Sequence, residues 1–326
     1  MNRLIVSLRK VESGKKMIEK KLTIQDQVEF LKQKGVIVEN LTYAVDYLSK
    51  HLNFYRLFAY TKLLSFKSTN KIINGVTFNH LVELSKIDLA FRRVILPMTI
   101  DIEFAAKLEM NCDCSCNTAD DGYSFASSYV QNNPELSKKY IDKIQKNTDE
   151  YGKDILKDHY PDLAVWHLTE LMTFGDFINF WKQYYNQFPK PGLNITWRNN
   201  LFFVTKKLRN ACAHNNFMLP SLVKKPSQVN KQLTSKLPIE LVRHGVQLSE
   251  SEKKTVRNSM LISDFAMMLM LFDEIVISNS LRTKAKSELN NLLTKRMIEN
   301  KELFSITPEL STYYHVFKKI LAVFCV

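Results

Sequence analysis

Glycine is scarce in this sequence, and the scarcity limits the folds and functional sites that the chain can form. Only 8 of the 326 residues are glycine, about a third of the number that an ordinary usage of about 7 % would give. The two closest glycines, Gly175 and Gly192, are 17 residues apart. Dinucleotide-binding fingerprints, Walker loops and nucleophile elbows each need two glycines within about seven positions. These nucleotide-driven and serine-hydrolase sites are therefore excluded, and the lack of turn residues favours long helices, an all-α fold.

The length and composition predict a basic globular protein in two parts. Lys and Arg number 46 against 33 Asp and Glu, which gives a net charge of +13, and 45 % of the residues are hydrophobic. At roughly 150 residues per domain, the length fits a basic arm with a small N-terminal helical module in 1–75 and a larger helical domain in 76–326. The polar stretch 111–134 is interpreted as an exposed loop inserted in the larger domain.

No segment is typical of a secreted or membrane-spanning protein. The apolar run Leu4-Ile5-Val6 is too short for the core of a signal peptide. The most apolar stretch, 260–277, is interrupted by acidic residues and predicts a buried helix rather than a membrane span. We therefore expect a cytoplasmic protein without a membrane partner.

Several helix boundaries can be predicted from capping residues and proline. Thr23 and Asn40 are good N-caps for two short helices near the N-terminus, and Gly35 is suited to the end of the first. A long helical pattern follows over 77–110, and Pro97 within it predicts a kink or a new start.

Three of the five cysteines lie close together, at Cys112, Cys114 and Cys116. Cysteines two apart form strained disulfides, and zinc knuckles use C-x2-C pairs, so the spacing favours a reduced surface loop. A metal or redox role for the cluster is the alternative. The histidines show neither H-x3-H nor H-E-x2-H spacing, so neither a metal nor another cofactor is expected.

A helix expected from Trp197 to about His214, with Thr196 as its N-cap, carries the candidate catalytic residues. Arg209, Asn210 and His214 lie off its apolar stripe. At 100° per residue, Asn210 and His214 share a face, whereas Arg209 and His214 are about 140° apart. A straight helix would not direct both at one phosphate unless Arg209 wraps around, the helix ends near Asn215, or a second copy contributes. Of these, the geometry favours a site completed across a symmetric homodimer. The apolar stripe itself consists of Leu201, Val204, Leu208 and Cys212.

An arginine and a histidine together have the chemistry needed to cleave RNA. Histidine can take the proton of a 2′-hydroxyl or give one to the departing 5′-oxygen. Arginine offers a fork of donors to phosphate oxygens as negative charge builds up. Taken alone, however, Arg-x4-His is a short pattern that often occurs by chance, and a histidine at a helix end is commonly a cap.

The segment Arg209-Asn210-Ala-Cys-Ala-His214 resembles the Arg-x4-6-His motif of HEPN ribonucleases, including the polar residue after the arginine. Five further segments, in order between about residues 20 and 220, resemble the Abi-like family of phage-defence proteins, the AbiD/AbiF abortive infection type. They are 23–35, 52–60, 88–93, 102–103 and 165–175. The chain departs from the family at Phe54 and Phe58-Ala59, where a second Tyr and a Ser-Gly are common.

The resemblance implies an all-helical HEPN-type bundle and a metal-independent endoribonuclease toxin of an abortive infection system. Arg209, Asn210 and His214 would be its catalytic residues at a dimeric site. It also implies two RNA partners, a substrate and a small structured noncoding RNA that restrains the toxin.

Other side chains are candidates for contact with RNA or for support of the catalytic residues. Aromatic and arginine side chains suit unpaired bases, and basic residues suit phosphates. Glu103 and Glu170 are candidates to orient His214 or a substrate hydroxyl, with a buried salt bridge to Arg92, Arg93 or Arg209 as the alternative. The candidates for RNA contact are Asn53, Tyr55, Arg56, Tyr60, Arg198, Lys206 and Lys207.

Two other functions remain open from the sequence. The same helix could only grip RNA, in a catalytically inactive HEPN-fold scaffold or an antitoxin-like protein. The N-terminal helical module could also bind duplex DNA in a transcriptional regulator, and its aromatic residues could simply be an amphipathic core helix.

Overall fold

The computed structural model describes residues 21–66, 68–146, 152–226, 231–299, 301 and 307–324. Within these ranges the fold is helical, and extended pairing is limited to isolated bridges between Ile37 and Thr77 and between Ser65 and Ile72. The all-α prediction is confirmed. The predicted basic arm lies outside the described residues except for Lys21. No helix in the described ranges is both long and apolar enough to cross a membrane.

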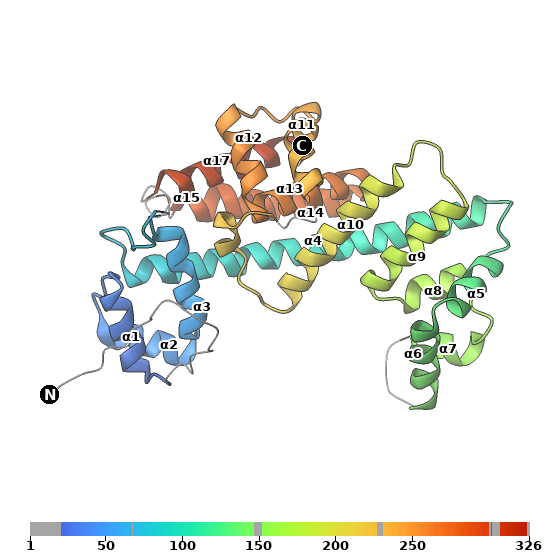
Figure 1. The fold of residues 1–326 in the computed structure, drawn as a ribbon, viewed down its shortest axis with the longest axis horizontal. Helices are drawn as coiled ribbons and strands as arrows, with labels where there is room; N and C mark the ends of the chain where they lie inside the picture. The colour runs from blue at the N-terminus through green and yellow to red at the C-terminus, as the bar shows by residue number, and fades with distance from the viewer. Residues whose placement is uncertain are drawn as a thin grey trace, which may run out of the picture.

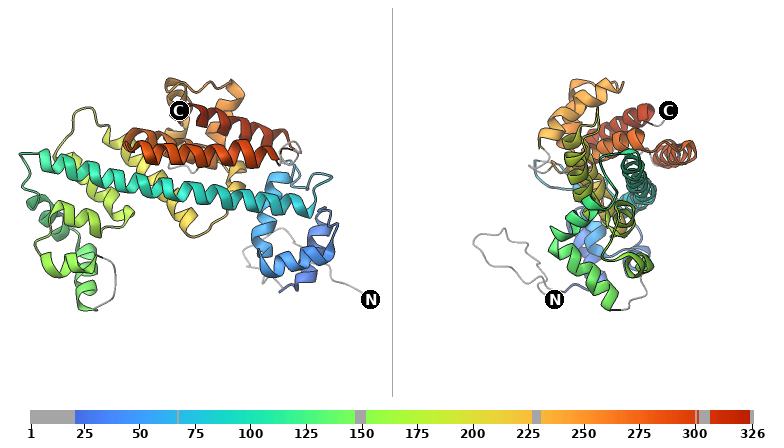
Figure 2. Two further views of the ribbon diagram at one scale, coloured as in Figure 1. Left: turned by 180° about the vertical axis from the view of Figure 1, so that it is seen from behind. Right: turned by 90° about the vertical axis from the view of Figure 1, so that its right-hand side faces the viewer.

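One long helix, α4 (Phe78–Cys116), organises the molecule and runs across the whole of Figure 1. Its 39 residues correspond to a length of about 58 Å. The first end of α4 carries a group of N-terminal helices, and its second end carries another group (Figure 1). The C-terminal helices lie along the side of α4 (Figure 2).

The helices divide according to where they pack on α4. The N-terminal group comprises α1 (Ile24–Gln33), α2 (Leu41–Lys50), α3 (Phe54–Ala59) and the short 3-10 helix η1 (Tyr60–Leu64). The group at the second end comprises α5 (Ser124–Gln131), α6 (Pro134–Gln145), α7 (Lys153–His159), α8 (Val165–Leu171) and α9 (Phe174–Gln187). The remaining elements are α10 (Ile195–Ala213), η2 (Leu219–Val223), α11 (Lys231–Arg243), α12 (Glu250–Asn258), α13 (Met260–Ile275), α14 (Asn279–Asn290), the π-helix η4 (Asn291–Arg296), α15 (Met297–Glu299) and α17 (Pro308–Phe324).

The predicted caps of the first two helices are confirmed. Thr23 and Asp26 form a reciprocal capping box at the start of α1, and Gly35 follows α1 with a φ of +98°. The Asn40 side chain accepts a hydrogen bond from the backbone N–H of Tyr43, at 2.9 Å, at the start of α2. Capping was predictable because it depends only on residues close in the sequence.

Residues 111–134 do not form the predicted insertion loop. Helix α4 continues to Cys116, and only 117–123 connect it to α5. The reason lies in a stripe of buried residues at every fourth position, which runs through Met110 to Cys114. The polar residues of this segment lie on the opposite side of the helix. Their high frequency in the sequence therefore wrongly suggests a loop.

Pro97 neither ends α4 nor starts a new helix, because the helix is continuous from Phe78 to Cys116. Proline removes one backbone hydrogen bond from a helix. Here Ile95, Met98 and Ile102 are fully buried around it. Their packing holds the helix together on both sides of the proline.

Helix α10 lies between α4 and α13 and runs antiparallel to both. Arg198, near its start, forms ion pairs with Glu109 of α4 and Glu274 of α13. Towards its end, residues of α10 pair instead with Glu103 of α4 and Asp264 of α13. The residue numbers therefore decrease along both neighbours as they increase along α10.

Candidate active site

The N-cap of the candidate catalytic helix lies two residues before the predicted one, Thr196. Asn194 caps it, and its side chain accepts a hydrogen bond from the N–H of Trp197 at 3.0 Å. The predicted apolar stripe is confirmed, since Leu201, Val204, Leu208 and Cys212 are all buried. Arg209, Asn210 and His214 therefore project away from the core.

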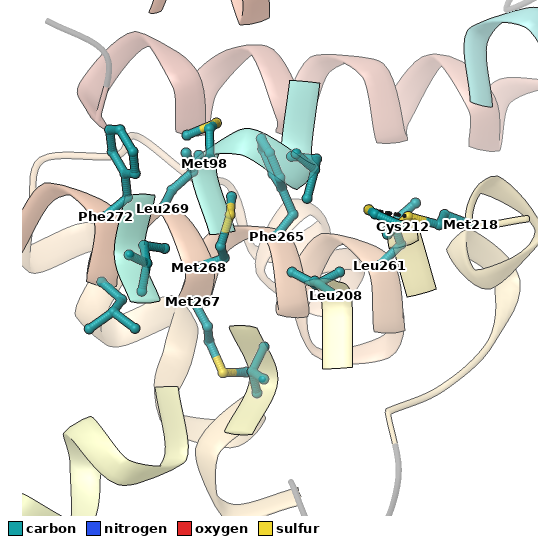
Figure 3. Close-up of a cluster of buried hydrophobic side chains, with 14 of the residues drawn as sticks. Met98, Leu208, Cys212, Met218, Leu261, Phe265, Met267, Met268, Leu269 and Phe272 are labelled. Atoms are coloured by element: carbon teal, nitrogen blue, oxygen red, sulfur yellow. Dashed lines mark hydrogen bonds between the residues drawn. The ribbon is translucent and has the colours of Figure 1, made fainter. Parts of the chain in front are cut away.

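The end of α10 is packed against the segment that follows it. Cys212 and Met218 are buried together, with their sulfur atoms 3.4 Å apart, and Figure 3 shows Leu208 and Leu261 beside them. Burial raises the pKa of the Cys212 thiol to about 12. A thiol in this state is a core side chain and not a nucleophile.

His214 is the C-terminal cap of α10, and its side chain is exposed. The next residue, Asn215, has a φ of +54°. Its N–H donates to the carbonyl of Cys212, and the N–H of Asn216 donates to the carbonyl of Ala211. These two bonds form a Schellman motif, which ends the helix at His214.

A buried carboxylate, Asp88 of α4, holds the chain just after His214. It accepts hydrogen bonds from the backbone N–H groups of Met218, at 2.8 Å, and Leu219, at 2.7 Å. It also accepts a hydrogen bond from the hydroxyl of Tyr60, at 2.9 Å, and pairs with Arg92. Asp88 therefore joins α4, η1 and the segment after α10 at one point.

Arg209 is held by two neighbours at the last turn of α10. Its Nε lies 3.8 Å from a carboxylate oxygen of Glu103, and its Nη1 lies 3.5 Å from the side-chain oxygen of Asn210. Glu103 also pairs with Lys107. Because 37 % of the Arg209 side chain remains exposed, the guanidinium is both positioned and accessible. In the described ranges no hydrogen bond joins Arg209 to His214.

The other supporting candidate, Glu170, lies apart from this contact. It is exposed on α8, and the described residues include no ion pair of its carboxylate. Of the two acidic candidates, the structure brings only Glu103 to the catalytic helix.

Two of the residues expected to contact RNA are inside the fold, which corrects that expectation. Tyr60 is buried and donates its hydroxyl to Asp88; burial, with the nearby Asp88 charge second, raises the pKa of this phenol. Arg198 is buried between Glu109 and Glu274. Charged and polar side chains of these kinds are also found buried when their hydrogen bonds are satisfied, and the sequence does not reveal those partners.

The lysines of α10 have different surroundings. The ammonium of Lys207 lies 2.5 Å from a carboxylate oxygen of the buried Asp264. Lys206 lies over the ring of Phe203, 4.8 Å from its centroid. Among the described residues Lys206 is therefore partnered by a ring, whereas Lys207 forms an ion pair with a buried carboxylate.

Helix α3 brings an aromatic residue to the end of α10. Tyr55 is 74 % exposed, and its ring centroid lies 6.2 Å from that of Phe217. Arg56, next to Tyr55, is half-buried, and Asn53 caps α3 through the N–H of Arg56. Tyr55 therefore extends the surface around His214 with an aromatic face.

Sequence reasoning missed Asp88 and Phe217. A signal for Asp88 was present, because an acidic residue on an otherwise apolar helical stripe must find buried partners. Nothing local to Phe217 distinguishes it from a core residue. Its contact with Tyr55 joins residues that are far apart in the sequence.

The cysteine cluster lies on the last turns of α4 and not on a loop. Cys112 and Cys116 are exposed, whereas Cys114 is buried and donates to a carboxylate oxygen of Asp120 at 3.3 Å. No group of three or more metal-binding side chains gathers among the residues that the structure describes.

The fold and the site define a class of protein: an all-helical chain in which α10, packed between α4 and α13, ends in an Arg-Asn-x3-His segment with an exposed asparagine and histidine. The Abi-like protein family matches residues 47–219, and the chain belongs to that family. The match includes α4, α10 and the backbone N–H groups that bind Asp88. The family associates the chain with abortive infection, a form of phage defence. No curated protein and no solved structure matches the chain.

Proposed function

We propose that the chain is a metal-independent endoribonuclease toxin of an abortive infection system, with a HEPN-type site. The observation that carries the proposal is that Asn210 and His214 are exposed, and Arg209 partly exposed, at the end of α10. Other charged groups on the neighbouring helices, such as Arg92 and Arg198, are paired inside the fold. An accessible arginine and an exposed histidine on a firmly held helix end suit a phosphodiester substrate.

The reaction would be the internal transfer of an RNA phosphodiester. The 2′-oxygen attacks the neighbouring phosphorus and the bond to the 5′-oxygen breaks, which leaves a 2′,3′-cyclic phosphate and a 5′-hydroxyl. His214 takes the 2′-hydroxyl proton or gives a proton to the 5′-oxygen. Arg209 stabilises the negative charge on the phosphate oxygens, and Asn210 positions the phosphate or the guanidinium.

A homodimer would complete this site. Arg209 and His214 are about 140° apart around an ideal helix, and in the described ranges no hydrogen bond joins them, which favours a second copy as the source of one of the two groups at a phosphate. Three large apolar residues of α4 are exposed beside Glu103: Ile100, Phe104 and Leu108, at 48 %, 63 % and 48 %. An apolar stripe of this kind next to the site supports association of two copies.

The oligomeric state tests the dimer. We expect the chain to elute with twice its mass in size-exclusion chromatography with light scattering, and Phe104→Glu to produce monomers. Ile277→Glu is the control, because Ile277 is exposed on its own at 83 %. A wild-type monomer that cleaves RNA at full rate would rule out the composite site.

Cleavage of RNA tests the activity itself. Protein freed of copurifying RNA, including the proposed noncoding RNA antitoxin, is incubated in EDTA with end-labelled RNAs. We expect Arg209→Ala and His214→Ala to reduce the rate by about 10²- to 10⁴-fold. Arg243→Ala and His244→Ala are matched controls, since this pair is also exposed at a helix end.

The alternative is an inactive HEPN-fold scaffold or antitoxin-like protein, in which α10 only grips RNA. It predicts tight RNA binding with no cyclic-phosphate product from any variant. Binding that weakens equally in the Arg209→Ala and Arg243→Ala variants would show that the surface charge as a whole is responsible.

A further inference from the structure

A small cavity opens beside the end of α10. Its volume is about 290 Å³, close to the lower end of the range for small-molecule sites. Leu208, Met218 and Leu261 form apolar walls, and Figure 3 shows these three side chains together. The half-buried ring of Phe217 also lines the cavity.

A buried polar atom of Asp264, a residue that lines this cavity, has no hydrogen-bond partner among the described residues. Asp264 is 2 % exposed, and one of its carboxylate oxygens pairs with Lys207. The other oxygen, Oδ1, is buried and accepts no hydrogen bond from the described residues. Burial raises the pKa of this carboxyl. A buried acceptor without a donor is costly, so a ligand that brings N–H groups would be stabilised there.

The cavity also lies beside the proposed catalytic histidine. On α10, Lys207, Ala211 and His214 fall within about 60° of one another, at 100° per residue. Asn216, which follows His214 closely, lines the same cavity. A ligand group held in the cavity would therefore belong to a substrate whose own backbone passes close to His214.

The rim of the cavity is basic. Lys224 is exposed at the rim, and the ammonium of Lys207 has further donors besides the one on Asp264. The cavity has apolar walls that include an aromatic ring, a hydrogen-bond acceptor at its bottom and lysines at its mouth. These features suit a nucleotide, whose nucleobase is flat and whose phosphate is anionic.

The arrangement of donors distinguishes the bases. Guanine presents two adjacent N–H donors, N1–H and N2–H, which match the two oxygens of a carboxylate, and its O6 can accept from a lysine. Adenine and cytosine place a ring-nitrogen acceptor beside their amino group. Uracil has one N–H between two carbonyl groups, and a carboxylate repels the oxygens of these carbonyl groups.

We propose that this cavity is a guanine-specific pocket, in which Asp264 and Lys207 bind a guanine of the RNA next to the cleaved phosphate. The inference rests on the proposed ribonuclease function and adds the sequence preference of the same site.

Binding of short RNAs tests the pocket without cleavage. The full chain with His214→Ala is titrated, by fluorescence anisotropy, with uridine-tract RNAs that carry one guanosine, inosine or adenosine. Inosine lacks only the 2-amino group. Loss of one hydrogen bond to a charged group corresponds to about a tenfold weaker Kd or more. We expect that difference between guanosine and inosine, and a further loss of affinity of at least the same size for adenosine, whose N1 is an acceptor that the carboxylate repels.

Protein variants locate the preference. Asp264→Asn on the same background should bind the guanosine and inosine RNAs equally. Asp273→Asn is the matched control, because Asp273 is on the same helix, pairs with Arg282 and does not line the cavity. The inosine comparison needs no change at Asp264, so it remains decisive even if Asp264→Asn does not fold.

The outcomes separate this inference from the function on which it rests. Equal binding of all three RNAs overturns the pocket, and wild-type cleavage without base preference leaves the nuclease in place. A guanosine preference without any cleavage by wild type retains the pocket and rejects the nuclease. Guanosine 5′-monophosphate that binds as tightly as the guanosine RNA would also overturn the proposal, since it would indicate a site for a free nucleotide.

Discussion

Asp88→Asn should destabilise the protein strongly, although the two side chains have nearly the same shape. The Asp88 carboxylate is fully buried and receives donors from two backbone N–H groups, Tyr60 and Arg92. The Asn variant keeps one acceptor oxygen but turns an NH₂ group towards donors. It also leaves the Arg92 charge buried without its partner.

The magnitude follows from the number of contacts that are lost. Hydrogen bonds to a charged group contribute about 1.5–3 kcal/mol each. Removal of one member of a buried ion pair costs about 3–5 kcal/mol. Since the Asn oxygen retains some of the donors, we expect the free energy of unfolding to fall by about 3–5 kcal/mol. Tyr60→Phe removes only one donor to the charged carboxylate and should cost about 1.5–3 kcal/mol, towards the lower end because the other donors remain.

Urea unfolding followed by circular dichroism measures both variants against wild type. Stability is also linked to the site, because Asp88 holds the backbone that follows His214. Asp88→Asn should therefore lower RNA cleavage even at temperatures where the variant is folded. A change in unfolding free energy below about 1 kcal/mol, or an effect no larger than that of Tyr60→Phe, would refute the reasoning.

Two further predictions concern the end of α10 and the cysteine cluster. Asn215→Val should lower stability by about 1–2 kcal/mol, because a β-branched residue resists the left-handed backbone there, whereas Asn215→Gly should be neutral; thermal melts distinguish them. Iodoacetamide at pH 8, with mapping by mass spectrometry, should label Cys112 and Cys116 first. Burial raises the pKa of Cys114 to about 11, so at pH 8 almost none of it is thiolate, and its labelling should be much slower than that of the two exposed thiols. Equal labelling of all three would contradict this placement.

Features that depend on neighbouring residues could be predicted from the sequence. The caps at Thr23 and Asn40 and the apolar stripe of α10 are examples. The position of Arg209 and His214 on one helix end also followed from the spacing. In each case a few adjacent residues determine the geometry.

Features that depend on partners far along the chain could not be predicted. Arg198 was interpreted as a contact for RNA, but it pairs with Glu109 and Glu274, 89 and 76 residues away. The polar residues after Met110 suggested a loop until the buried Cys114 revealed the continuing stripe. A sequence shows which groups need a partner, but the packing of helices decides which one they find.

The long helix α4 also sets the spacing of the site. Asp88 fixes the backbone after His214, whereas Glu103 holds Arg209, and the two acids are separated by about 22 Å along the helix. Pro97 lies between them, where the helix lacks one backbone hydrogen bond. Because Arg209 and His214 lie on the same helix, α10, a bend of α4 at Pro97 would not separate them from each other. It would change the distance between the two acids, and so pull either Asp88 or Glu103 away from the end of α10.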